Sequence, residues 1–441
     1  MKPGVKRHAK RQGLLTVACA LIVLAVPASA GAHAALVTAT PGWGTQLSAM
    51  PHALRLAFDE DVVPQYARVA VVSTSGQDFA GSPEASGAVV IVPLRAGRTG
   101  SYTVRWRVLA SSDGHTTEGA YSFGVGVKPL PPAPLGGVGV PVAPQILAWL
   151  QFLGVVLAGG VLTFRALVWA PAARVLEERE APDARVAIWV GVAGAVIALH
   201  AGLLAFLTGA YPIVGGTLSS FVDSEVEPIR VATHLGQAWT LTTFAWLGVL
   251  ALLVAAWVTP RQREPLLAGT GVLSLGIALG LSWASHPESH GNLALVADYA
   301  HLVAAALWVG GLVAVAMIAA TTRSLPSAAR EAVARACILR FSKLAVPAVA
   351  VVAIAGVYLA LRELPSPSAL ISSSYGITLF VKSFVALGAL ALGGYHRRFV
   401  VPRLAAGATV VTIRRTLTLE LGLLLGVLAL AAVLSQTAPP A

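Results

Sequence analysis

The feature that most constrains the fold of this chain is a series of eight apolar segments that begins at residue 145. Each is close to the roughly 20 residues that an α-helix needs to cross a bilayer. Backbone polar groups in lipid must find partners within the chain, so these segments are expected to be helical. The sequence therefore predicts an all-α polytopic membrane domain of about eight transmembrane helices over residues 145–436, with helices near 145–169, 187–209, 235–258, 266–284, 295–320, 343–361, 376–395 and 416–435.

The distribution of charge predicts that this domain lies in the plasma (cell) membrane as a multi-pass protein. Only 12% of the residues are charged, whereas soluble domains carry about 25%. Fifteen basic residues lie in the loops after the first, third, fifth and seventh segments, against Arg230 and Arg362 in the alternate loops. Because basic loops remain cytoplasmic, the N-terminal region is expected on the extracellular or periplasmic side. That region, residues 33–127, carries six Arg against seven acidic residues, which argues against nucleic acid as a partner.

Residues 1–32 have the organisation of a secretory signal peptide. Basic residues precede an apolar core at Leu14–Val26, and Ala30-Gly31-Ala32 fits the small-residue cleavage pattern. Cleavage after Ala32 makes His33 the first residue of the mature protein. Cleavage after Ala30 is the competing site, and an uncleaved anchor is a further alternative.

Residues 33–127 predict a small all-β domain. Between residues 102 and 109, apolar side chains at even positions alternate with Thr103, Arg105, Arg107 and Leu109, the two-residue period of a half-buried strand. Further strands are expected at 54–58, 67–72, 89–92 and 120–125, separated by turn residues. Short strands at this spacing favour a sandwich or a barrel. Residues 128–144, with six prolines and three glycines, predict a semi-rigid linker.

A mature N-terminal His33 offers a metal ion two nitrogen donors, the α-amine and the imidazole. Asp113 and His115 add an oxygen and a nitrogen, and Glu60 is a candidate extra ligand or a hydrogen-bonding partner of a ligand. This donor set favours Cu(II), which has the highest affinity among divalent first-row metals, with zinc as the competitor. The chain has only three methionines, so the soft ligands that select Cu(I) are scarce. If cleavage follows Ala30, His33 would instead bind Cu(II) together with backbone nitrogens.

Ionisable residues at membrane depth suggest a route for an ion, because such groups are costly in lipid and usually face the bundle interior. Asp298 and His301 lie three residues apart and are expected to share one helix face. Interfacial positions for the histidines and snorkelling for Lys382 and Glu420 are the structural alternatives. The candidate transport path comprises His200, His286, Asp298, His301, Lys382 and Glu420.

Several motifs carry a resemblance to known families. Two stretches resemble the C-terminal half of the CopC family of periplasmic copper-binding proteins, namely Tyr102 to His115 and Gly119 to Phe123. Three more resemble its N-terminal half: His33 to Leu36, Thr40-Pro41 and Phe58 to Glu60. The membrane part is similar to the CopD family at Ser285-His286, Asp298 to His301, Leu307 to Leu312, Arg340 to Ser342, Tyr375-Gly376 with Lys382, and Glu420 with Leu434.

This resemblance implies an all-β Ig-like Greek-key sandwich with Cu(II) ligands at His33, Asp113 and His115, followed by an eight-helix copper-transport domain. We expect a non-enzymatic copper-homeostasis protein that binds Cu(II) outside the cell membrane and imports copper, with copper ions and the lipid bilayer as partners. No Walker A motif is present to supply energy.

Two other functions remain open at this point. The membrane domain could be a haem-binding electron carrier and cupric reductase, with His200 and His301 as one axial pair. The N-terminal histidine chelate could instead serve an oxidative copper enzyme, although the Asp ligand suits storage or transfer better than oxygen activation.

Overall fold

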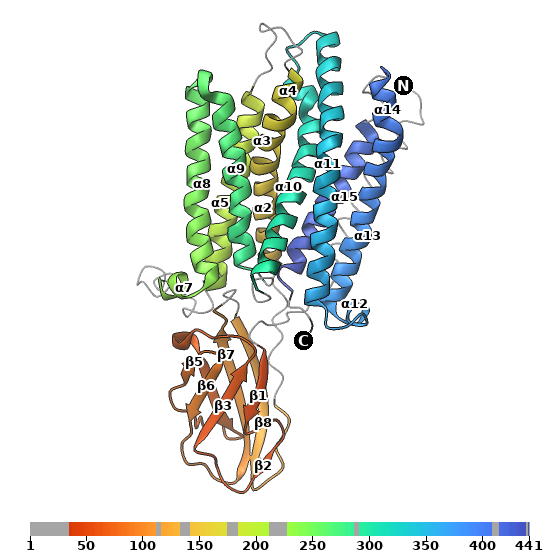
Figure 1. The fold of residues 1–441 in the computed structure, drawn as a ribbon. Coiled ribbons are helices and arrows are strands. Elements are labelled where there is room, and N and C mark those ends of the chain that lie inside the picture. The colour runs from red at the N-terminus through yellow and green to blue at the C-terminus, as the bar shows by residue number, and fades with distance from the viewer. Residues whose placement is uncertain are drawn as a thin grey trace, which may run out of the picture.

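The computed structural model describes residues 35–111, 116–132, 142–173, 184–210, 227–285, 291–407, 414–437 and 440. A β-sandwich lies at one end of a bundle of long helices (Figure 1). The predicted signal peptide and the candidate ligands His33, Asp113, His115 and His286 lie outside the described residues. We call the end of the helical bundle beside the sandwich the near end, and the opposite end the far end.

Two four-stranded sheets form the sandwich, as the predicted fold class requires. The first has the strand order β1-β3-β6-β5 and the second β2-β8-β7-β4. All neighbouring strands are antiparallel except β2 and β8. The bounds are β1 Leu36–Thr40, β2 Gln46–Leu47, β3 Ala53–Phe58, β4 Arg68–Ser73, β5 Glu84–Ser86, β6 Val89–Pro93, β7 Gly100–Leu109 and β8 Thr116–Val125, with a short helix η1 at Pro64–Tyr66.

Apolar side chains at alternate positions of the strands fill the space between the sheets. Tyr102, Val104 and Val108 of β7 are buried, which confirms the predicted two-residue period. The hydroxyl of Tyr121 donates a hydrogen bond of 2.9 Å to the carbonyl oxygen of Pro41, which joins β8 to the end of β1. Burial raises the pKa of the Tyr121 phenol well above its usual value, so this donor keeps its proton.

Within the described residues, eight helical spans are long and apolar enough to cross a membrane, as the sequence predicts. The first runs from Ala143 to Ala173 and comprises α2, η2, α3, η3 and α4. Of these, η2 and η3 are π-helical segments, whose turns are wider than those of an α-helix. The bounds in this span are α2 Ala143–Gly154, η2 Val155–Gly160, α3 Val161–Phe164, η3 Arg165–Trp169 and α4 Ala170–Ala173. The other helices are α5 Arg185–Ala210, α7 Glu227–Ala232, α8 His234–Val258, η5 Pro260–Gln262, α9 Arg263–Trp283, α10 Asn292–Thr321, α11 Ser327–Glu363, α12 Ala369–Ser372, α13 Ser374–Tyr395, η7 His396–Val400, α14 Val401–Ala405 and α15 Arg414–Leu434.

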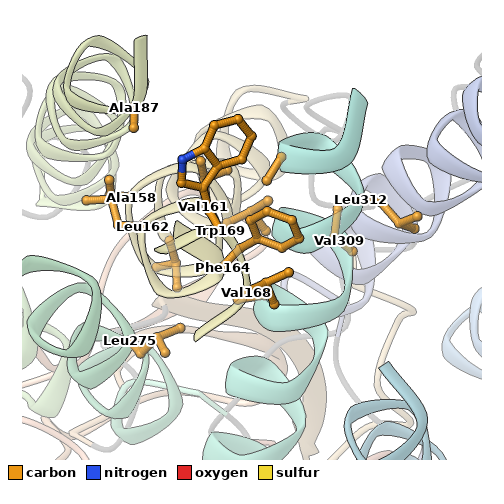
Figure 2. Close-up of a cluster of buried hydrophobic side chains, with 14 of the residues drawn as sticks. Ala158, Val161, Leu162, Phe164, Val168, Trp169, Ala187, Leu275, Val309 and Leu312 are labelled. Carbon is orange, nitrogen blue, oxygen red and sulfur yellow. The ribbon is translucent and has the colours of Figure 1, made fainter. Parts of the chain in front are cut away.

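The first span lies at the centre of the helical bundle and packs against several others. Figure 2 shows Phe164, Val168 and Trp169 of this span in one apolar cluster with Ala187 of α5 and Val309 of α10. Glycines allow the closest approach, since a Cβ on Gly310 would lie 2.6 Å from the Cα of Gly160. Small residues at such contacts are the usual means by which membrane helices pack tightly.

Candidate functional site

Three segments of the sandwich meet at the turn that follows β3. The amide of Asp59 donates to the carbonyl oxygen of Ala35 at 3.1 Å, and the amide of Ser111 donates to that of Asp61 at 3.0 Å. Glu60, which is half-buried, lies between the two bonded residues. Ala35 is two positions after His33, and Ser111 is two positions before Asp113. The described chain thus brings together the segments that lead into the predicted ligands.

The same end of the sandwich contacts the near end of the helical bundle. The carbonyl oxygen of Ser111 accepts a hydrogen bond of 3.1 Å from the amide of His234, the first residue of α8. Thr233 caps this helix, because its hydroxyl accepts from the amide of Gly236 at 3.0 Å. The His234 ring stacks on Trp283 at the end of α9, with 5.1 Å between ring centroids.

An apolar cluster, the junction cluster, covers the contact between the two domains. Val63 and Leu109 from the sandwich pack with Phe206 of α5 and Ile229 of α7, and all four are at most 4% exposed. Phe206 also stacks on Trp239, with centroids 4.4 Å apart. Alternation along β7 places Leu109 with the outward-facing residues. It is nevertheless buried, because the helical domain covers it.

A polar cluster lies within the helical domain towards its near end. Asp298 and His301 are on α10, about 9 Å and 13 Å from the first residue of the helix at 1.5 Å per residue. Lys382 of α13 interacts electrostatically with both side chains. Asp298 also lies beside the hydroxyls of Ser282 and Ser285, where α9 ends. The structure therefore brings together three of the sequence-predicted path residues from two helices.

The orientation of His301 suits an ion-binding role. Its Nδ1–H donates to the carbonyl oxygen of Val352 on α11 at 3.0 Å, which leaves the lone pair of a neutral ring on Nε2. Metal-binding histidines commonly have their second nitrogen fixed in this way. The ring lies against Gly356, where a Cβ would be 3.1 Å from the His301 Cε1.

Two further polar groups belong to this neighbourhood, and neither was among the sequence-predicted path residues. Glu363, at the end of α11, is 5% exposed, and Tyr375, near the start of α13, is 6% exposed. Tyr375 interacts electrostatically with both Glu363 and Asp298. The only sequence signal for Glu363 was a carboxylate at the end of an apolar segment, which is also typical of a solvated helix terminus.

The other path candidates lie elsewhere. His200 is exposed on α5, and its Nδ1 bonds to the Val196 carbonyl of its own helix at 2.8 Å. Because His301 faces α11, the two histidines do not form the axial pair that a haem carrier would need. Glu420 is 2% exposed on α15 near the far end, where its Oε2 lies 2.9 Å from Nδ1 of His396. Among the described residues, no three His, Cys, Asp or Glu side chains group closely enough to hold a metal ion together.

Comparison with known proteins decides the family. The CopC domain model matches residues 36–126, and the model described as copper resistance protein D (CopD) matches residues 335–434. Copper resistance protein C of Pseudomonas syringae pv. tomato is 34% identical over 110 residues, which cover 23% of this chain and 86% of that protein. This chain belongs to the CopC family, and its residues 335–434 match the CopD model. The CopC match includes Asp113 and His115, and the CopD match includes Lys382, His396 and Glu420.

Other relatives extend the comparison over most of the chain. The copper transport protein CutJ of Bacillus subtilis is 24% identical over 447 residues, covering 95% of this chain and 77% of the relative. Protein YobA of Escherichia coli K12 is 34% identical over 105 residues, which cover 23% of this chain and 84% of YobA. The crystal structure of CopC from Methylosinus trichosporium OB3b, at 28% identity and a TM-score of 0.21, aligns with 23% of this chain and all of that one.

These findings establish a multi-pass membrane protein of the copper transport and resistance families. The names of the relatives concern copper transport and copper resistance, in keeping with the expected non-enzymatic role.

Proposed function

We propose that this protein binds Cu(II) outside the cell with its CopC domain and passes the ion into the CopD-containing bundle for import. The observation that carries the proposal is the junction itself. Ser111, from which the chain continues to Asp113, is hydrogen-bonded to His234 at the near end of the helices. An ion released there would be beside the end of α9, where His234 stacks on Trp283 and where Asp298 lies beside Ser282 and Ser285.

Capture is assigned to His33, Asp113 and His115, with Glu60 as a further candidate. The backbone bonds from Asp59 to Ala35 and from Ser111 to Asp61 support this assignment, because they tie the segments leading to these ligands to one turn. Imidazole, amine and carboxylate donors favour Cu(II) over Cu(I). The orientation with this domain outside is supported by the fifteen basic residues in the loops after the first, third, fifth and seventh segments.

Entry is assigned to Asp298 and His301. Lys382 interacts electrostatically with both side chains, and its ammonium would balance the charge of the Asp298 carboxylate when no ion is present. An incoming cation would take over this role, using Asp298 as a charged ligand and the Nε2 lone pair of His301. His286 follows Ser285 directly in the sequence and stays a candidate ligand at the mouth. His200, which lies on the outside of α5, has no part in this route.

The driving force for import would come from the ion gradient and the membrane potential. Moving one elementary charge through 100 mV is worth about 2.3 kcal/mol, so a divalent ion gains about 4.6 kcal/mol.

Uptake of isotopic copper into proteoliposomes of known orientation tests this function. We expect His301→Gln and Asp298→Asn to abolish uptake, whereas His200→Gln, a matched change on the exposed face of α5, leaves it unchanged. Supplying Cu(I) and Cu(II) in parallel identifies the transported species. Equal uptake by His301→Gln and the unmodified protein would refute the entry step.

Capture is tested in cells that express the full chain. We expect His115→Ala to lower copper accumulation, and His52→Ala, which changes an exposed histidine of the same domain, to have no effect. Accumulation that does not change in His115→Ala would exclude the CopC domain from the route.

A further inference from the structure

We infer that His396 and Glu420 form a second cation-binding site, at the far end of the helical bundle, for a divalent first-row metal ion. This inference rests on the proposed transport function, because it supplies the site from which an imported ion would leave on the cytoplasmic side. The two residues come from α15 and from η7, the wide-turn segment that continues α13.

The first observation is a buried carboxylate at membrane depth. Glu420 is 2% exposed and lies six residues after the start of α15, about 9 Å along its axis at 1.5 Å per residue. Ionisable groups in such positions are costly and generally serve a site or an ion path. Its Oε2 lies 2.9 Å from Nδ1 of His396, whose side chain is 12% exposed.

The charge on Glu420 is compensated by His396 only while the imidazole is protonated. The basic residues that follow His396 are directed elsewhere. Arg397 donates to the carbonyl oxygen of Ser342 at 3.1 Å, and the Arg398 guanidinium lies 5.7 Å from the Phe399 ring centroid. A bound cation would balance the carboxylate and leave the imidazole neutral, the form in which histidine ligates metals.

The second observation is a glycine that makes room for the carboxylate. Gly393 lies three residues before His396, on the same face of α13 and its continuation. A Cβ on Gly393 would be 3.2 Å from Oε1 of Glu420, closer than ordinary van der Waals contact. The backbone of α13 therefore borders one carboxylate oxygen, while the imidazole from the next turn contacts the other.

The donor spacing is that of two neighbouring metal ligands. With metal–ligand bonds of about 2.0–2.2 Å, two donors at a right angle are about 2.8–3.1 Å apart. Nδ1 and Oε2, at 2.9 Å, already have this separation. Thr416, whose Oγ1 lies 2.7 Å from Nε2, fixes the ring from its other side.

A purely structural clamp between α13 and α15 is the rival explanation, and metal stoichiometry separates the two. The purified full chain in nanodiscs would be equilibrated with excess Cu(II), desalted, and analysed for copper per protein. We expect Glu420→Gln and His396→Gln each to lose one equivalent, because an amide keeps a polar side chain at the position but is a poor metal ligand. Thr418→Val, which changes an exposed hydroxyl that bonds to the Arg415 carbonyl of its own helix, retains that equivalent.

Exchanging the two residues controls for misfolding. The double variant His396→Glu with Glu420→His keeps one imidazole and one carboxylate, and we expect it to regain the lost equivalent. Unchanged stoichiometry in Glu420→Gln and His396→Gln overturns the inference, as does failure of a monodisperse exchanged variant to bind the ion. Either failure leaves the uptake defect of His301→Gln intact, so it can be told apart from failure of the proposed function.

Discussion

The contact between the two domains can be broken by one substitution, Phe206→Ala. The Phe206 ring is 4% exposed, belongs to the junction cluster and stacks on Trp239 at 4.4 Å with an interplanar angle of 8°. Both domains have large separate cores to which Phe206 does not belong. We therefore expect the substitution to separate the domains without unfolding either one.

The expected effect follows from the burial of that ring. Removing a buried phenylalanine side chain costs about 3–5 kcal/mol. Part of this cost stays within the helical domain, because Trp239 is on α8. Since each 1.4 kcal/mol is a factor of ten in an equilibrium, up to about 3 kcal/mol lost from docking reduces the ratio of docked to undocked molecules by at most roughly 100-fold. The junction cluster contains only three other fully buried side chains, Val63, Leu109 and Ile229, so this is a large share of its stability.

Hydrogen exchange at the amide of His234 measures docking directly. The first amides of a helix have no partner within that helix, and this one donates to Ser111 in the other domain. We expect its exchange in Phe206→Ala to be up to roughly 100-fold faster, if docking is what protects it. Phe244→Ala, which truncates a 69% exposed ring in the middle of α8, is the matched control. Unaltered exchange at His234 would show that the cluster does not hold the domains together.

Two further substitutions test the packing of each domain. A Cβ on Gly310 would lie 2.7 Å from the carbonyl oxygen of Val156 as well as close to Gly160, so Gly310→Ala should lower stability in thermal unfolding by about 1–3 kcal/mol. Gly276→Ala, where a Cβ meets nothing within 4 Å, should not, and equal unfolding temperatures for the two would contradict this account. Tyr121→Phe should cost about 0.5–1.5 kcal/mol, measured as faster exchange of β8 amides. Because the pKa of Tyr121 is raised in the folded state, its contribution is complete below the unfolded pKa near 10 and declines at higher pH, a decline that the Phe variant should lack.

The two domains could be told apart from the sequence because their apolar residues follow different patterns, a two-residue alternation in the sandwich and long unbroken segments in the helical bundle. Strand alternation and long apolar segments place β7 and six of the eight spans within about six residues of their observed bounds, but α11 begins 16 residues before the predicted position 343 and the seventh span continues ten residues beyond 395. Leu109 shows what this reasoning misses. The two-residue period gives the face of the sheet on which a side chain lies, but a second domain that covers the outward face leaves no signal in that period.

The sequence predicted how deep in the membrane the ionisable residues of the candidate site lie, but not which way their side chains face. Asp298, His301 and His200 are all ionisable residues within apolar helices. No feature of the sequence shows which of them face the interior of the bundle. The side chains of α5 itself are apolar on every face of the helix. The sequence therefore has no polar stripe to indicate that His200 is exposed while His301 faces α11. The partnership of Asp298 with Lys382 depends on how α10 and α13 are placed, which residue spacing does not determine.

His396, at the far end, is another residue whose neighbours the sequence did not indicate. In the sequence it precedes two arginines and belongs to a basic loop, yet the structure continues α13 through η7, which keeps His396 in line with Gly393 and within reach of Glu420. At the near end, Asp298 and His301 lie three residues apart on α10 and both interact with Lys382. A carboxylate and an imidazole thus lie near each end of the bundle, and only the near pair has a lysine beside it. If that ammonium substitutes for an absent ion, Lys382→Met should strengthen binding at the near pair and slow release from it, while the far pair keeps its affinity.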